Sequence, residues 1–229
     1  MLPIYLIFDL LYYLFFGILD GGFVSIILWL IIIYFVVNVV FGGTLPNPIK
    51  FFRRHKRFSE LKQTVKTYPG NIAAALEFGE MLLERRKYEQ ALVYLERANE
   101  RITDSARLAW LMGECFTLLQ KYDLGLTNLE QAVSLDPKMG FGRPYVFLLH
   151  IELHTANDPG KIESLKDKVL IYGSTEACYK AGKLLKKHGD KVGAIAMFKE
   201  VLGNYEASPG KMRKIHRKWA LLSRVNMAF

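Results

Sequence analysis

One local pattern appears twice in the chain at a fixed offset of 34 residues. The first copy occupies residues 72–105 and the second occupies residues 106–139. A period of this length is typical of helix-turn-helix repeats. One helix pair cannot bury its apolar face alone, so we expect neighbouring pairs to stack into a solenoid. The recurring small, aromatic and apolar residues are Gly79 and Gly113, Tyr88 and Tyr122, Ala91 and Gly125, Leu95 and Leu129, and Ala98 and Ala132.

Both copies resemble the tetratricopeptide repeat (TPR) family. Its pattern places Trp, Leu-Gly and Tyr on the first helix, then Ala, Phe and Ala on the second, with a closing Pro. The resemblance implies an all-α fold and is weak evidence for any one function. The second copy carries Trp110 one place off register, then Met112-Gly113, Phe116, Gly125, Leu129, Ala132 and Pro137. The first copy carries Phe78-Gly79, Leu82, Ala91, Leu95 and Ala98, with Thr103 in place of the usual Pro.

The resemblance extends in both directions and covers residues 58–208. Pro69 lies two periods before Pro137, which indicates a half repeat upstream of the first copy. Downstream, one segment has repeat length but few pattern residues, and the next returns to register one residue late. The predicted segments are a basic linker and half-repeat helix at 46–71, a solenoid of about four helix pairs at 72–208 with a degenerate unit at 140–174 and a last unit at 175–208, and a basic capping helix at 209–229.

The N-terminal stretch is apolar. Residues 23–41 are 19 consecutive uncharged residues, which as a helix would span roughly 28 Å, close to the thickness of a bilayer's hydrocarbon core. Residues 3–19 are also apolar but contain Asp9, and Asp20-Gly21-Gly22 supplies turn chemistry between the two runs. We expect a transmembrane helical hairpin over residues 1–45. The alternative is one span preceded by an interfacial or re-entrant helix.

Charge is divided unevenly along the chain. Residues 1–49 contain no Lys or Arg and only two acidic residues, so the remainder holds all 31 basic residues against 20 acidic ones, a formal charge of +11. The positive-inside rule places the basic flank after the apolar stretch, and the repeats that follow it, in the cytoplasm. Basic residues beside a membrane attract anionic lipid headgroups. The residues expected to do so are Lys50, Arg53, Arg54, Lys56 and Arg57.

The resemblance to TPR proteins also implies a concave groove lined by the first helix of each unit. This groove would run from acidic to basic along the solenoid, with Trp110 and Tyr179 as aromatic anchors for a protein partner. The alternative places both aromatic residues inside the superhelix and leaves the lysines as ordinary solvated side chains. The predicted groove residues are Leu76, Glu80, Glu84, Arg107, Trp110, Glu114, Thr117, Tyr179, Lys183, Lys186 and Lys187.

Motifs of catalysis or cofactor binding are absent from the sequence. It has no phosphate loop and no dinucleotide fingerprint. His150 and His154 are four residues apart with Glu152 between them, but the order HIELH is not the HExxH of zinc proteases, so we expect no metal and no cofactor. Cys115 and Cys178 are expected to be buried, reduced thiols. The basic charge has no nucleic-acid-reading motif beside it.

We therefore predict an all-α, non-enzymatic protein of the bacterial inner membrane. A transmembrane hairpin would hold a TPR-like α-solenoid at the cytoplasmic face, where the solenoid serves as a scaffold or adaptor for protein partners. The alternative function is an accessory or assembly subunit of an integral-membrane complex, recognised through the hairpin. Expected partners are proteins, soluble or integral to the membrane, and anionic lipid headgroups. No nucleic acid is expected, and self-association stays open.

Overall fold

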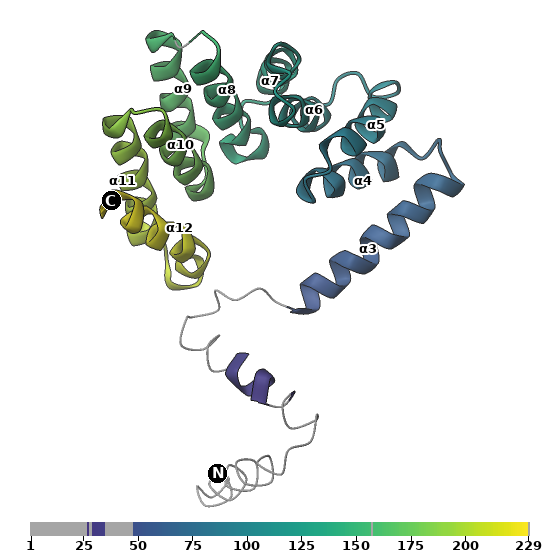
Figure 1. Ribbon diagram of the computed structural model, residues 1–229, viewed down its shortest axis with the longest axis horizontal. Coiled ribbons are helices and arrows are strands. Elements are labelled where there is room, and N and C mark those ends of the chain that lie inside the picture. The colour runs from purple at the N-terminus through teal and green to yellow at the C-terminus, as the bar shows by residue number, and fades with distance from the viewer. Residues whose placement is uncertain (1–26, 28, 35–47, 157, 229) are drawn as a thin grey trace, which may run out of the picture. The chain divides into compact units, whose positions relative to one another are not determined.

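The computed structural model describes residue 27 and residues 29–34, 48–156 and 158–228. The chain divides into two compact units, residues 1–47 and residues 48–229. The second unit is made of helices (Figure 1). They are α3 (Pro48–Thr67), α4 (Ile72–Glu84), α5 (Tyr88–Asn99), α6 (Ala106–Leu118), α7 (Tyr122–Leu135), the 3-10 turn η1 (Met139–Gly142), α8 (Arg143–His154), α9 (Pro159–Tyr172), α10 (Thr175–Lys187), α11 (Lys191–Ala207) and α12 (Gly210–Ala228).

Within the second unit, consecutive helices pack as pairs: α4 with α5, α6 with α7, α8 with α9 and α10 with α11. The pairs follow an arc in which the first helices lie on the inner side and the second helices on the outer side (Figure 1). At one end α3 packs against α4, and at the other end α12 packs against α11 and α10. The expected all-α helical-repeat solenoid is therefore confirmed.

Glycines on the first helices explain the spacing of the pattern. A Cβ atom at Gly113 would lie 2.6 Å from Cγ of Leu129, and one at Gly182 would lie 2.8 Å from Cε1 of Phe198. The same arrangement occurs in the first unit, where a Cβ atom at Gly79 would lie 2.9 Å from Cγ of Leu95. Because no side chain intervenes, a large apolar residue of the second helix packs directly on the backbone of the first. Close packing of this kind is what fixes the two helices of a unit together.

The turns inside three of the pairs share a geometry. The backbone N–H of Arg86 donates to the carbonyl of Leu83 at 2.9 Å, a bond of the Schellman motif that ends helices. Arg86 has a φ of 61°, in the left-handed region. Gln120, 34 residues later, has a φ of 60°, and Gly189 in the last pair has a φ of 89°. Each of these three first helices therefore ends at a left-handed residue that reverses the chain.

Apolar side chains fill the unit in two clusters, one running from α3 to α6 and the other from α6 to α12. Leu95 and Leu129 are fully buried, one in each cluster. Cys115 and Cys178 are also fully buried and are not bonded to each other. Burial raises the pKa of both thiols to about 12, so they stay protonated. Their role is to fill space in the core.

The N-terminal transmembrane hairpin expected for residues 1–45 requires correction. A crossing needs a helix of about 20 apolar residues. Among the described residues, no helix reaches the length and apolar character that a bilayer crossing demands. In this stretch the structure describes helix only at residue 27 and at residues 29–34, and the rest of the expected hairpin, with Asp9, lies outside the described residues. The fold class that stands is an all-α helical repeat.

Candidate functional site

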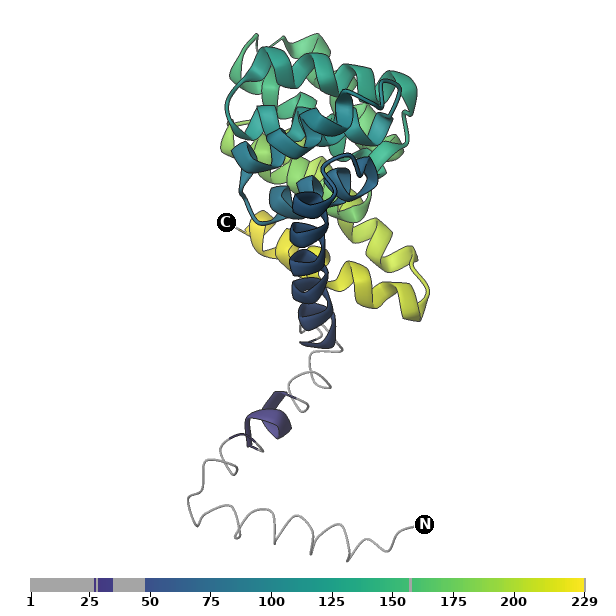
Figure 2. The ribbon, with the colours of Figure 1, turned by 90° about the vertical axis from the view of Figure 1, so that its right-hand side faces the viewer.

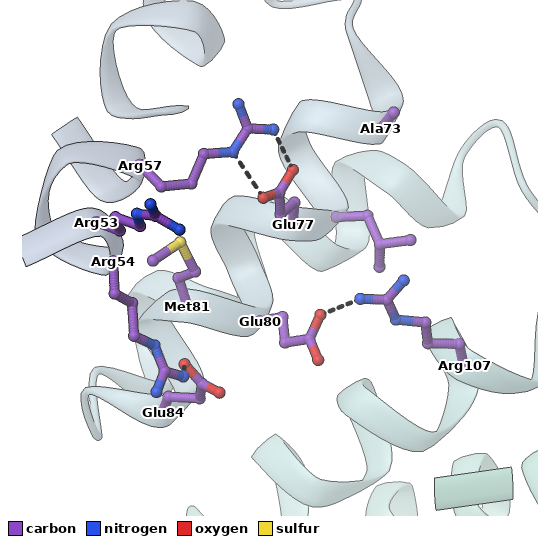
Figure 3. Close-up of a pocket in the computed structure, with 10 residues that line it drawn as sticks. Arg53, Arg54, Arg57, Ala73, Glu77, Glu80, Met81, Glu84 and Arg107 are labelled. Carbon is purple, nitrogen blue, oxygen red and sulfur yellow. Dashed lines mark hydrogen bonds and ion pairs between the residues drawn. The ribbon is translucent and has the colours of Figure 1, made fainter. Parts of the chain in front are cut away.

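A groove with a volume of about 690 Å³ lies between α3, α4 and α6 (Figure 3). Apolar side chains, Leu76 and Met81 the largest of them, line it together with charged side chains of both signs. It sits beside the first helices of the first two units, where the TPR resemblance places a concave binding surface. The remaining lining residues are Arg53, Arg54, Arg57, Ala73, Glu77, Glu80, Glu84 and Arg107.

Three carboxylates of the groove come from one helix. Glu77, Glu80 and Glu84 lie on α4 at spacings of three and four residues. Residues at these spacings are neighbours on one face of a helix. We call these three residues the carboxylate ladder. Like charges so close together repel one another, so the ladder needs positive charge nearby.

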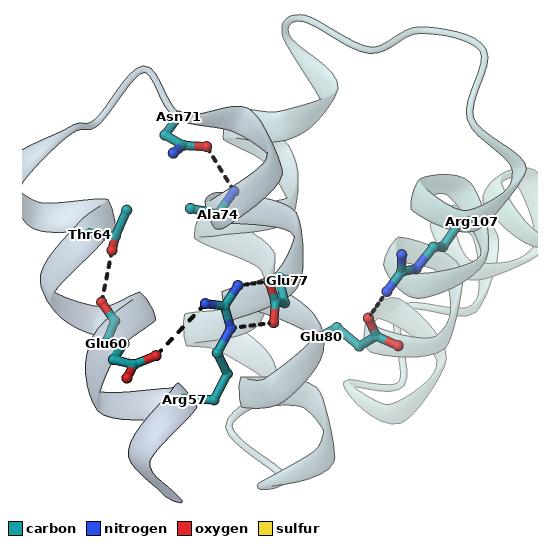
Figure 4. A network of polar contacts seen from close by, with 8 residues as sticks. All are labelled: Arg57, Glu60, Thr64, Asn71, Ala74, Glu77, Glu80 and Arg107. Carbon is teal, nitrogen blue, oxygen red and sulfur yellow. Dashed lines mark hydrogen bonds and ion pairs between the residues drawn. The ribbon is translucent and has the colours of Figure 1, made fainter. Parts of the chain in front are cut away.

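Arginines on the neighbouring helices supply that charge. Nε and Nη2 of Arg57, on α3, donate to the two carboxylate oxygens of Glu77 at 2.8 and 2.6 Å (Figure 4). This two-point contact is the strongest geometry available to an arginine and a carboxylate. The other two pairs join Arg107 of α6 to Glu80 and Arg54 of α3 to Glu84.

The pairing of Arg57 with Glu77 favours the ionised forms of both groups. The hydrogen bond from Arg57 is the main cause that lowers the pKa of Glu77, and the positive charges of Arg57 and Arg107 act in the same direction against the effect of burial. The same hydrogen bond raises the pKa of Arg57. All three arginine side chains are at least half exposed to solvent. Ion pairs in such positions contribute little to stability, so they can be exchanged for others.

Trp110 and Glu114, both predicted to line the groove, lie in a separate buried cluster on α6. Glu114 is 5 % exposed, and its Oε1 accepts a hydrogen bond from Nη2 of Arg143 at 2.9 Å. The Arg143 guanidinium lies 5.1 Å from the centroid of the Trp110 ring. Burial raises the pKa of Glu114, and the charge of Arg143 opposes this shift. Oε2 of Glu114, Nε of Arg143 and the indole nitrogen of Trp110 are buried without a hydrogen bond of normal geometry.

A left-handed turn, η1, adjoins this cluster. Gly140, Phe141 and Gly142 have φ values of 60°, 52° and 78°. A Cβ atom at Gly140 would lie 3.2 Å from the Trp110 ring, and the carbonyl of Phe141 accepts a hydrogen bond from the N–H of Ser174 at 2.9 Å. The Phe141 ring is nevertheless 76 % exposed. A bulky residue with positive φ is rare, and here contacts on both sides hold the turn.

The basic end of the predicted groove is partly covered by the C-terminal helix. Tyr179 is 7 % exposed, and its ring centroid lies 5.3 Å from that of Trp219 on α12. Nδ2 of Asn226 donates to the Tyr179 hydroxyl at 3.3 Å, and Nζ of Lys186 donates to the Asn226 carbonyl at 2.6 Å. These two predicted groove residues therefore contact the chain's own last helix. Exposed predicted groove residues at this end are Lys183 and Lys187.

The structure thus brings together one part of the predicted groove and separates the rest. Thr117 is buried like its neighbours on α6, and its hydroxyl donates to the carbonyl of Gly113 at 2.7 Å. The sequence predicts a membrane surface for the arginines of α3 and does not predict their place in the groove. The half repeat predicted at residues 46–71 could have indicated this place, because a helix that precedes α4 in the repeat must pack against α4. The predicted residues that share the groove are Leu76, Glu80, Glu84 and Arg107.

Three histidines meet outside the groove. The ring centroids of His150 and His154 are 4.3 Å apart, and those of His154 and His188 are 4.5 Å apart, with Tyr122 beside them. Among the described residues, no group of three or more His, Cys, Asp or Glu side chains is placed to hold a metal ion. Burial lowers the pKa of His150 to about 4, and the charges of His154, His188 and Lys187 add to this effect. Nothing in the spacing of the histidines along the chain indicates that His188 joins this pair.

Comparison with known proteins supports the fold. No family model and no curated protein matches the chain. Two crystal structures of MamA match it with a TM-score of 0.51 and 18% identity, over 65% of this chain and 86% or 81% of MamA. YrrB, described as a TPR protein with an unusual peptide-binding site, matches with a TM-score of 0.49 and 16% identity, over 74% of this chain and 85% of YrrB. At 18% identity the likeness to MamA bears on the fold alone, and it agrees with the helical-repeat solenoid that the 34-residue period indicates.

Proposed function

We propose that this protein is a protein-interaction scaffold that holds a segment of a partner in the groove between α3, α4 and α6. The observation that carries the proposal is the groove itself, about 690 Å³ of open space with apolar side chains and paired charges along it. Binding sites in proteins combine an apolar surface with a few placed polar groups. No reaction is proposed for the chain.

The helical-repeat architecture supports this function. Stacked helix pairs create extended concave surfaces that such proteins use for binding. Leu76 is half-buried and Ala73 is exposed in the groove, so apolar contact area is available beside the charges. Three opposed pairs of charged side chains already line the groove, so a partner that carries charge can exchange with them. The affinity gained by replacing these ion pairs depends on how well the charges of the partner complement those of the groove.

Site-specific photo-cross-linking in living cells tests this function. A photoreactive amino acid is placed at Ala73, which lines the groove, and as a control at Val93, which is exposed on the outer helix α5. We expect a protein adduct from position 73 and none from position 93. Glu80→Arg should abolish the adduct, because it sets two like charges side by side with Arg107. Equal adducts at both positions, or no adduct at position 73, would contradict a binding role for the groove.

The location of the protein is a separate proposal. Lys50, Arg53, Arg54, Lys56 and Arg57 are all exposed on α3, which supports contact with anionic lipid headgroups at about 1 kcal/mol per basic residue near a membrane surface. We also propose that the repeat domain lies in the cytoplasm at the inner membrane, where these residues would meet anionic lipid. Co-sedimentation with vesicles of anionic and of neutral lipid tests the contact, and protease protection in spheroplasts tests the side of the membrane. Equal sedimentation with anionic and with neutral vesicles would contradict the proposed contact with anionic lipid headgroups.

A further inference from the structure

The N-terminal half of α3 is attached to the solenoid by different contacts from those of its C-terminal half. Among the α3 side chains that the structure describes, the buried ones, Leu61 and Val65, lie in the C-terminal half, with Phe58 partly buried beside them. From Phe52 to Arg57 every side chain is exposed. Figure 2 shows this half of the helix extending beyond the packed helices. Within these described side chains, apolar burial therefore holds the C-terminal half of α3.

Ion pairs with the carboxylate ladder hold the other half. Arg54 and Arg57, three residues apart on one face of α3, pair with Glu84 and Glu77. All four side chains are at least 40% exposed. Exposed pairs are weak and are screened by salt. The carboxylate ladder is thus occupied by a basic helix segment that the rest of the packing does not fix.

We infer that the carboxylate ladder is a docking surface for a basic helical segment of a partner protein, and that residues 48–57 of this chain are its resident occupant. The inference deepens the proposed function by naming the partner's chemistry. Charge complementarity supports this inference. Three carboxylates at helical spacing fit basic side chains three or four residues apart on a facing helix, and α3 itself shows such a helix seated there. A partner would displace Arg54 and Arg57 and replace two weak ion pairs with its own.

Peptide binding measured by fluorescence polarisation tests the inference. The probe is a fluorescein-labelled, alanine-based helical peptide with arginines in pairs three residues apart, added to the purified full-length protein. The double variant Arg54→Ala/Arg57→Ala should bind about fivefold more tightly than the natural chain, because two exposed ion pairs no longer compete. The matched control is Lys62→Ala/Lys66→Ala. Both lysines are exposed on the same helix and no ion pair to them is described, so this variant loses the same charge and should bind within twofold of the natural chain.

The ladder is tested in the same assay. In the Arg54→Ala/Arg57→Ala background, Glu77→Gln and Glu84→Gln together should weaken the peptide at least tenfold, because charge-assisted contacts are lost. All altered side chains are partly or fully exposed, so the fold should persist, and circular dichroism checks it. Equal gains in the two alanine variants would show that only net charge matters and would overturn the inference. Unchanged binding after loss of the glutamates would do the same.

The outcome separates this inference from the proposed function. If the peptide binds no variant while a photoreactive group at Ala73 still captures a partner, the scaffold role stands and the basic class of partner is wrong. If the peptide binds as described while Ala73 captures nothing in cells, the ladder has the stated chemistry and the cellular role is wrong.

Discussion

His150 makes the stability of the solenoid depend on pH between about 4 and 6.5. Its imidazole is half-buried in the cluster with His154, His188 and Tyr122, near Lys187. Burial and the neighbouring positive charges disfavour its protonated form and lower its pKa from 6.5 to about 4. The unfolded chain therefore takes up a proton between these two values that the folded chain does not. The stability that the neutral His150 contributes is fully present above pH 6.5 and is lost as the pH falls toward 4.

The size of the effect follows from the shift. One pKa unit corresponds to about 1.4 kcal/mol, and at pH 5 the linkage relation gives a loss of roughly 2 kcal/mol relative to neutral pH. Solvent reaches part of the ring, so we halve this figure to about 1 kcal/mol. His150→Gln keeps a polar side chain of similar reach but removes the titration. Between pH 7 and pH 5 the natural chain should lose about 1 kcal/mol more than this variant.

Urea unfolding followed by circular dichroism at several pH values measures the difference. Carboxylates also titrate toward pH 5, but they do so equally in both proteins and cancel in the comparison. His55→Gln, at an exposed position on α3 outside the cluster, serves as the control and should follow the natural chain. Parallel stability curves for the natural chain and His150→Gln would refute the reasoning. So would a natural chain that gains stability on acidification.

Further predictions concern packing, the turns and the buried ion pair. Gly113→Ala should lower the free energy of unfolding by about 1–3 kcal/mol, because its Cβ would lie 2.6 Å from a leucine of the facing helix, whereas Gly203→Ala, in open space, should raise it by about 0.5–1 kcal/mol. Equal effects in urea unfolding would contradict the packing account. Arg86→Gly should stabilise by about 1 kcal/mol, since a φ of 61° strains any residue with a Cβ; a loss of thermal stability would count against this. Arg143→Met should cost about 2 kcal/mol by leaving Glu114 buried without its partner, and adding Glu114→Met should recover most of that loss. Strictly additive losses in this double-mutant cycle would show that the two residues are not coupled.

The sequence alone determined the helix pairs and their order. Gly113 and Leu129 recur one period after Gly79 and Leu95 because a large side chain must pack on a bare stretch of backbone in each unit. That requirement is local to one helix pair, so it appears as a period in the chain. Hydropathy over residues 1–45 was a weaker guide, because the apolar character of a segment does not establish the helix that a membrane crossing needs.

Only the tertiary structure decided which predicted groove residues face open space. Trp110 lies against Gly140 of a left-handed turn, and Tyr179 lies against Trp219 of the last helix. Position within a repeat fixes the face of a helix on which a residue lies, but not what the next turn or the terminal helix places over that face. The same holds for Arg57, for which the sequence predicts a lipid contact but not an ion pair with Glu77. Its partner Glu77 is 20 residues away, and the two groups meet because α3 folds back along α4.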